Sequence, residues 1–176
     1  MSDDAKPTDA DKGQQGRKQP AAKLKARIAR SAARLAAVQA LYQMEIAGTP
    51  LHEVRQEFEN HRLGAEIEGA TYAEADIDHF RDVLAGAVKN QVRIDQMTDR
   101  ALVNKWPLGR IDATLRALFR AAGHELVVRQ DIPPKVVIGE YVDVAKAFFS
   151  GKEPGLVNGV LDHMAREARP GALEAR

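Results

Sequence analysis

KLKARIARSAARLAAVQALYQMEI, residues 23–46, is the stretch that organises the chain. It is rich in Ala and contains neither Gly nor Pro, so its helix propensity is high. Large apolar side chains recur at helical spacing along one side, namely Leu24, Ile28, Leu35, Val38, Tyr42 and Ile46. A basic stripe follows an adjoining side and consists of Lys23, Arg27, Arg30 and Arg34. The pattern predicts a helix with one buried side and one cationic side.

The basic stripe is the main functional signal in the sequence. No acidic residue occurs between Asp11 and Glu45, whereas salt-bridged surface helices usually interleave the two charges. A merely solvated helix face is the alternative interpretation. We favour contact with nucleic acid through its phosphates, which gives salt-sensitive affinity with little sequence information. Gln39 and Tyr42 lie on the same helix beyond the stripe and are candidates for further contacts with the nucleic acid.

Composition narrows the class of protein. The chain has 176 residues, 44% of them hydrophobic, and a formal net charge of only +1, so any affinity for nucleic acid must come from local charge segregation. The sequence has no Cys, which excludes disulfides, thiolate catalysis and cysteine-ligated metal sites. No apolar run approaches the roughly 18–20 residues that a membrane span needs. We therefore expect a soluble, cytoplasmic protein.

Helical patterns continue through the rest of the chain. Further helices are expected over residues 51–62, over 73–106 with a phase slip at 90–93, and over 111–129, 135–149 and 153–164. Residues 1–20 read as a disordered tail, 64–71 as a loop and 171–176 as a frayed end. No segment shows convincing strand alternation. The sequence predicts one all-α domain over residues 21–170, a compact bundle of six or seven helices.

Patterns that catalysis or metal binding would need are missing from the sequence. The five His residues are scattered and form no HxxxH or HExxH pair. Acidic residues near predicted helix starts, such as Asp76 and Asp112, are explained by the helix dipole. No phosphate-binding loop and no nucleophile motif occurs. We expect a protein that is not an enzyme and that uses no cofactor and no metal.

A series of short motifs resembles the NusB family of bacterial transcription antitermination factors. The matching runs are Ala37-Val38-Gln39-Ala40-Leu41-Tyr42, Phe80-Arg81-Asp82 with Leu84-Ala85-Gly86, Arg110-Ile111-Asp112 with Leu115-Arg116-Ala117, Glu125-Leu126, Ile132-Pro133-Pro134-Lys135-Val136-Val137-Ile138 with Glu140-Tyr141-Val142 and Ala145-Lys146, and Val157-Asn158-Gly159-Val160-Leu161-Asp162. In chain order they extend over roughly residues 26–169.

The resemblance implies a fold, a ligand and a set of partners. The implied fold is two packed three-helix sub-bundles, and the implied ligand is the single-stranded boxA element of ribosomal RNA leader transcripts. The RNA is bound together with NusE, a small-subunit ribosomal protein, in a complex with NusA, NusG and RNA polymerase that promotes processive elongation. The implied RNA-binding residues are Arg27, Arg30 and Arg34 of the first helix together with Lys152, Leu156 and Asn158. The implied partner-binding residues are Arg110, Asp112 and Arg116.

Three positions depart from the family pattern. Gly139 stands where Asn is usual, Leu156 replaces a frequent aromatic residue, and His124 stands where Tyr is common. Two other functions stay open: a NusB-like targeting domain related to ribosomal RNA cytosine methyltransferases, and a helical interaction scaffold that binds no RNA. Length and the absence of a catalytic Cys oppose the first. The sequence also leaves open a homodimer of the free protein.

Overall fold

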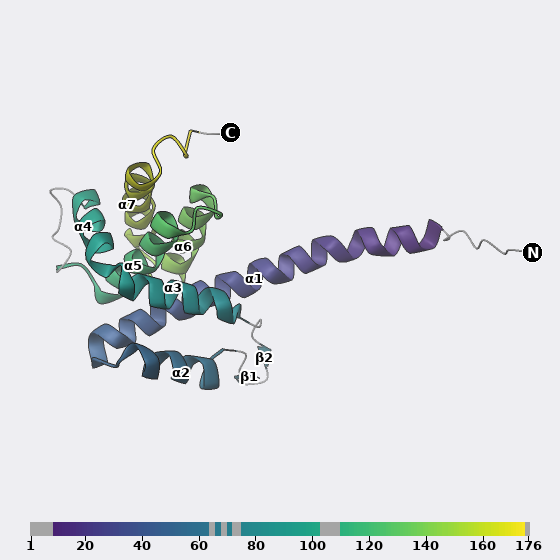
Figure 1. Ribbon diagram of the computed structural model, residues 1–176, viewed down its shortest axis with the longest axis horizontal. Coiled ribbons are helices and arrows are strands. Elements are labelled where there is room, and N and C mark those ends of the chain that lie inside the picture. The colour runs from purple at the N-terminus through teal and green to yellow at the C-terminus, as the bar shows by residue number, and fades with distance from the viewer. Residues whose placement is uncertain (1–8, 64–65, 68–69, 72–74, 103–109, 175–176) are drawn as a thin grey trace, which may run out of the picture.

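The computed structural model describes residues 9–63, 66–67, 70–71, 75–102 and 110–174. Seven helices make up nearly all of this part of the chain, which confirms the all-α prediction (Figure 1). They are α1 (Asp9–Ala47), α2 (Leu51–His61), α3 (Ile77–Lys89), α4 (Gln91–Ala101), α5 (Ala113–Val128), α6 (Pro134–Phe148) and α7 (Glu153–Ala168). Helices α1 to α3 pack together, α4 to α7 form a second group, and α5 joins the groups by also packing on α1 and α3. The resemblance implied three helices in each group. The second group has four, because the break at Asn90 makes α4 a separate helix that packs on α5 and α7.

Helix α1 is much longer than expected. It begins at Asp9, so residues 9–20, which we predicted to be disordered, are helical, while residues 1–8 lie outside the described part. Once a helix has formed, each added residue gains a hydrogen bond without a new nucleation cost, and Gln, Lys and Arg are good helix formers. Pro20 lies inside the helix. The N-terminal part of α1 projects away from the other helices (Figure 1).

Helix boundaries elsewhere follow local chemistry. Gly48 ends α1 with a φ of 66°, a left-handed conformation that favours Gly over other residues. The predicted slip at residues 90–93 is confirmed, because Asn90 separates α3 from α4 and its Nδ2 donates to the Gly86 carbonyl at 3.0 Å. Asp112 accepts a hydrogen bond from the backbone N–H of Thr114 at 2.7 Å and so caps α5. The predicted helix end at residues 106–109 lies outside the described residues.

Two expectations about irregular segments were wrong. The stretch predicted as a loop contains two short antiparallel strands, β1 (Glu66–Ile67) and β2 (Ala70–Thr71), paired as Glu66 with Thr71 and Ile67 with Ala70. A strand of two residues is too short to show an alternating pattern in sequence. At the C-terminus, residues 171–174 form a turn rather than a frayed end, because Leu173 packs against the core and Glu174 pairs with Arg166.

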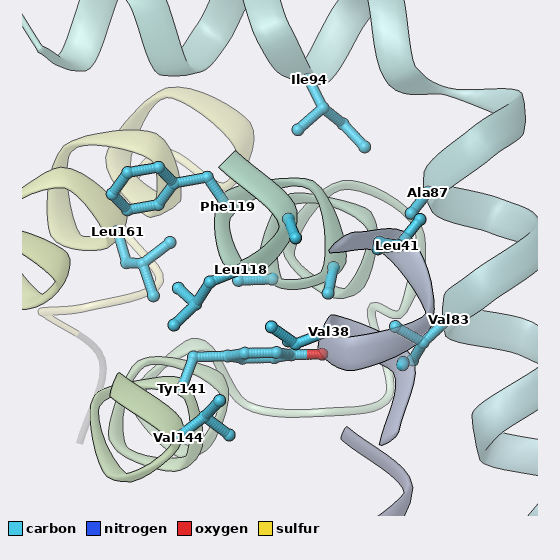
Figure 2. Packing of buried hydrophobic residues seen from close by; sticks show 14 of the residues in the cluster. Val38, Leu41, Val83, Ala87, Ile94, Leu118, Phe119, Tyr141, Val144 and Leu161 are labelled. Atoms are coloured by element: carbon cyan, nitrogen blue, oxygen red, sulfur yellow. The ribbon is translucent and has the colours of Figure 1, made fainter. Parts of the chain in front are cut away.

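The core lies around α5, and side chains from α1, α3, α5, α6 and α7 converge there (Figure 2). Leu118 and Phe119 of α5 and Tyr141 of α6 are almost completely buried, and each such side chain contributes roughly 1.5–3 kcal/mol. The buried part of α1 is built from small residues, including Ala33, Ala37 and Ala40, which lets the helix approach α3 and α5 closely. This packing fixes the C-terminal half of α1. In the described part, no helix is long and apolar enough to cross a membrane.

Candidate nucleic-acid interface

A groove runs between the middle of α1, over residues 23–34, and the helices α6 and α7. Its volume is about 1210 Å³, and three members of the basic stripe, Lys23, Arg27 and Arg30, line its α1 side. Asn158 of α7 lines the same groove, as do Lys135 and Lys146 of α6. We call this hollow the α1–α6 groove. The fold therefore joins the predicted basic stripe to the predicted Asn158, two features that lie more than a hundred residues apart in sequence.

The basic stripe divides into an exposed and a buried part. Lys23, Arg27 and Arg30 are exposed, and the Arg27 side chain keeps 74% of its accessible surface. Arg34 also borders the groove, but only 2% of the residue is accessible. Its guanidinium donates to Glu125 of α5, with Nε 3.0 Å from Oε2 and Nη2 2.9 Å from Oε1. Arg34 is a buried structural residue in this conformation, so the expected direct contact between Arg34 and RNA does not fit the structure.

Glu125 is the centre of a buried polar network at the base of the groove. Besides Arg34, it accepts hydrogen bonds from His79 Nε2 at 3.1 Å and from the Tyr141 hydroxyl. Burial alone would raise the pKa of Glu125, but the hydrogen bonds from His79 and Arg34 and the positive charge of Arg34 lower it to about 2. Burial, followed by the charge and hydrogen bond of Glu125, raises the pKa of Tyr141 well above its usual value. Glu125 is therefore ionised and fully partnered at neutral pH, while Tyr141 stays protonated and donates.

Two acidic side chains from other parts of the chain lie close to the exposed arginines. The sequence alone could not show these contacts. Glu140 Oε1 of α6 lies 3.7 Å from Arg27 Nε, and Asp76 Oδ2 lies 3.7 Å from Arg30 Nε. The backbone N–H of Asp76 also donates to the Ala29 carbonyl at 3.0 Å, which ties the start of α3 to α1. The stripe is thus partly neutralised by residues that are distant in sequence.

The remaining RNA-binding candidates lie elsewhere. Gln39 and Tyr42 line a second hollow of about 330 Å³, next to Ile46 and Phe148. Lys152 is exposed just before α7, and Leu156 is half-buried against the core; neither borders the α1–α6 groove. The structure therefore brings Asn158 to the stripe, but it separates Gln39, Tyr42, Lys152 and Leu156 from it.

The partner-binding candidates lie at the start of α5. Arg110 is exposed immediately before the helix, and Asp112 caps its N-terminus. Arg116 is mostly buried, pairs with Glu45 of α1 and donates to the Ile111 carbonyl. Asp112 and Arg116 thus have structural roles that are sufficient to explain them.

Sequence reasoning missed the α6 side of the groove. Lys135, Gly139, Val142 and Lys146 all line it, and their spacings of 4, 3 and 4 place them on one helix face. This spacing could have identified a shared face of α6 from the sequence. That the face borders a groove with α1 follows only from the packing of the two helices. In the described residues no group of three or more metal-ligating side chains occurs.

Comparison with known proteins decides the family. The model of the NusB family matches residues 31–166. The chain belongs to the NusB family. It is 56% identical over 142 residues to the transcription antitermination protein NusB of Nitrobacter hamburgensis, covering 81% of this chain and 89% of the relative. It is 53% identical over 140 residues to that of Mesorhizobium japonicum, covering 80% and 90% of the two chains.

Solved structures of NusB proteins share the fold. T. maritima NusB superposes with a TM-score of 0.65 at 29% identity, covering 83% of this chain and 97% of the other. A complex of the antitermination factors NusB and NusE with double-stranded RNA gives a TM-score of 0.63 at 20% identity, covering 78% and 96%. The curated NusB relatives are named as antitermination proteins rather than enzymes, in agreement with the non-enzymatic interpretation. The family match begins at residue 31, so the projecting part of α1 lies outside it.

Proposed function

We propose that this NusB-family chain is a transcription antitermination factor that binds boxA RNA of ribosomal RNA leader transcripts together with NusE. In this proposal it acts in the cytoplasm, in a complex with NusA, NusG and RNA polymerase that promotes processive elongation. The observation that carries the RNA part is the α1–α6 groove, which unites the exposed cations of α1 with Asn158 of the family motif. The curated relatives supply the antitermination role, and the solved complex of a protein with the same fold supplies the two partners to test.

The groove suits a single strand of RNA held mainly through its phosphates. Lys23, Arg27 and Arg30 lie along α1 over roughly 10 Å at the helical rise of about 1.5 Å per residue, so they can follow a short run of backbone. Asn158 is exposed on the opposite wall and can both donate and accept hydrogen bonds at a base edge. Cations would therefore provide affinity and orientation, while NusE and the α7 wall would add specificity.

Partner binding is assigned to the start of α5. Arg110 is the exposed cation there, while Asp112 and Arg116 fix the helix terminus on which it is presented. Lys152 and Leu156, near the start of α7, and Gln39 and Tyr42, in the second hollow, are proposed as outlying RNA contacts. An RNA that occupied the groove and the second hollow together would extend along most of the exposed side of α1.

Binding of boxA RNA and a scrambled RNA of equal composition, with and without NusE and over a salt series, tests the proposal. We expect weak, strongly salt-dependent binding alone, and tighter, sequence-dependent binding with NusE. The variant Arg27→Gln/Arg30→Gln should lose affinity, with a salt slope that is lower by about 1.4, because each phosphate contact to a single strand contributes about 0.7. Lys89→Gln/Arg93→Gln is the matched control, because both residues are exposed cations outside the groove.

Two results would contradict the proposal. Equal affinity for both RNAs in the presence of NusE would exclude boxA recognition. Unaltered affinity of the double Arg variant would favour the alternative in which the chain is an interaction scaffold with a solvated basic face. Circular dichroism of each variant shows whether the helical fold has been kept.

A further inference from the structure

The two exposed arginines of the basic stripe, Arg27 and Arg30, are each paired with a carboxylate. In the Arg27 pair the two side chains differ strongly in solvent exposure. The Arg27 side chain is 74% exposed, whereas that of Glu140 is only 11% exposed. Arg27 lies on the part of α1 that borders the groove but is not enclosed by other helices, while Glu140 lies on the packed helix α6. The arginine can move with little cost, and the carboxylate cannot.

Further contacts fix Glu140 in place. The Ser31 hydroxyl donates to Glu140 Oε2 at 2.6 Å, and Arg34 Nη1 lies 3.5 Å from the same oxygen. Arg34 is itself fixed by Glu125, so Glu140 is attached to the buried polar network. Its other oxygen, Oε1, faces Arg27 at 3.7 Å. A stationary anion is thus held against the most exposed arginine of the stripe, in the position where an RNA phosphate would bind.

We propose that Glu140 acts as a latch, a built-in anion that competes with RNA phosphates for Arg27. The proposal rests on the proposed function, since it concerns the same groove, and it assigns Glu140 as a positioning residue that lowers RNA affinity. In the free protein Arg27 pairs with Glu140; on binding, its guanidinium turns toward a phosphate and leaves Glu140 with Ser31 and Arg34. Breaking the pair uses part of the phosphate binding energy, so RNA must supply other contacts to bind tightly. Asp76 also lies 3.7 Å from Arg30, but the two side chains of that pair are similarly exposed, at 34% and 45%.

Glu140→Gln tests the latch, because the amide oxygen can still accept from Ser31 while the charge is removed. We expect binding of both boxA and scrambled RNA to become tighter by about 1.4-fold to fivefold, the range set by a mostly exposed ion pair. The salt slope should stay close to that of the wild type, because Arg27 contacts a phosphate in the complexes of both proteins and Glu140→Gln changes only the cost of freeing it.

A matched control separates the latch from a general loss of negative charge. Asp143 lies on the same helix, lines the same groove, is 68% exposed and pairs only loosely with Lys146 at 3.9 Å. Asp143→Asn should change RNA affinity less than Glu140→Gln. The decisive measurement is a double-mutant cycle: in an Arg27→Gln background, Glu140→Gln should no longer tighten binding.

Three outcomes would overturn the latch. These are weaker RNA binding by Glu140→Gln, an equal effect of Asp143→Asn, and an undiminished effect of Glu140→Gln in the Arg27→Gln background. Glu140→Asp gives a second variant if Glu140→Gln does not fold. It keeps the negative charge on α6 but shortens the side chain by one methylene, which moves the carboxylate away from Arg27; a gain in affinity supports the latch, whereas no gain opposes it. If the protein bound boxA and scrambled RNA equally well, only the boxA proposal would fail. The latch would still be testable, because the double-mutant cycle can be measured with either RNA.

Discussion

Replacing Glu125 by Gln should destabilise the protein by about 3 kcal/mol at neutral pH. The substitution removes a fully buried carboxylate and leaves the Arg34 guanidinium, 2% exposed, without its main counter-charge. Breaking a buried pair in this way typically costs about 3–5 kcal/mol. The lower end applies because Glu140 remains 3.5 Å from Arg34 Nη1 as a second anion. The pKa of Glu125, lowered from 4.5 to about 2, implies a stabilisation of similar size, about 3 kcal/mol.

The same shift predicts the pH dependence of the free energy of unfolding. A carboxyl group whose pKa is lower in the folded state stabilises the fold above its unfolded pKa and loses that contribution as pH falls. For Glu125 the stabilisation should be complete above pH 4.5 and should disappear as pH falls toward about 2. Glu125→Gln lacks this group, so its unfolding free energy should change less than that of the wild type over the same range.

Urea unfolding at neutral pH and across pH 2 to 5 provides the measurement. At this chain length a loss of 3 kcal/mol should lower the Tm by about 6–12 °C. The double variant Arg34→Met/Glu125→Leu removes both charges, and it should cost less than the two single losses added together. A loss below about 1 kcal/mol in Glu125→Gln, with pH dependence equal to that of the wild type, would refute the assignment of this network as a main stabilising element.

Three further substitutions test other features of the fold. Arg169→Met should cost about 3 kcal/mol in urea unfolding, because the buried Arg169 guanidinium donates to four backbone carbonyls around the end of α5 at 2.6–2.8 Å. Arg166→Met is its control, because Arg166 is an exposed residue in the last turn of α7, three positions before Arg169. Gly86→Ala should destabilise the α3–α5 contact by about 1–3 kcal/mol, because the new Cβ would lie 2.0 Å from the ring of His124, and His124→Ala should restore part of the loss. Asp112→Ala should cost about 1 kcal/mol through loss of the α5 cap, with Asp112→Asn close to the wild type; equal stability of the Ala variant would show that the cap contributes nothing.

The helices could be predicted from sequence because their cause is local. Periodic apolar residues and the phase slip at residues 90–93 marked α1, α2, α3, α5, α6 and α7 to within a few residues at most ends. The start of α1 was missed, because composition alone distinguishes poorly between a polar tail and the extension of a helix that is already stable. The strands β1 and β2 were missed because each has only two residues.

The candidate site was predicted less well, because its charges are balanced by residues distant in sequence. Arg34 shares the helical spacing of Arg27 and Arg30, yet its partner Glu125 is 91 positions away and turns a predicted RNA contact into a buried ion pair. Glu140 is likewise 109 positions from Ser31. Periodicity shows which face of a helix a residue occupies, but it does not show what the next helix places against that face.

The length of α1 gives the packed core control over a distant part of the molecule. Residues 9–26 form the projecting part of one continuous helix, and at about 1.5 Å per residue they extend roughly 27 Å. The rod is held beyond this part, by the contacts of Arg27, Ala29 and Arg30 and by the packing of Ala33, Ala37 and Ala40 between α3 and α5. A tilt of about 5° at that point would move the tip by roughly 2 Å. Small adjustments among three core helices are thereby magnified at the end of α1, which works as a lever whose pivot lies next to the buried Glu125 network.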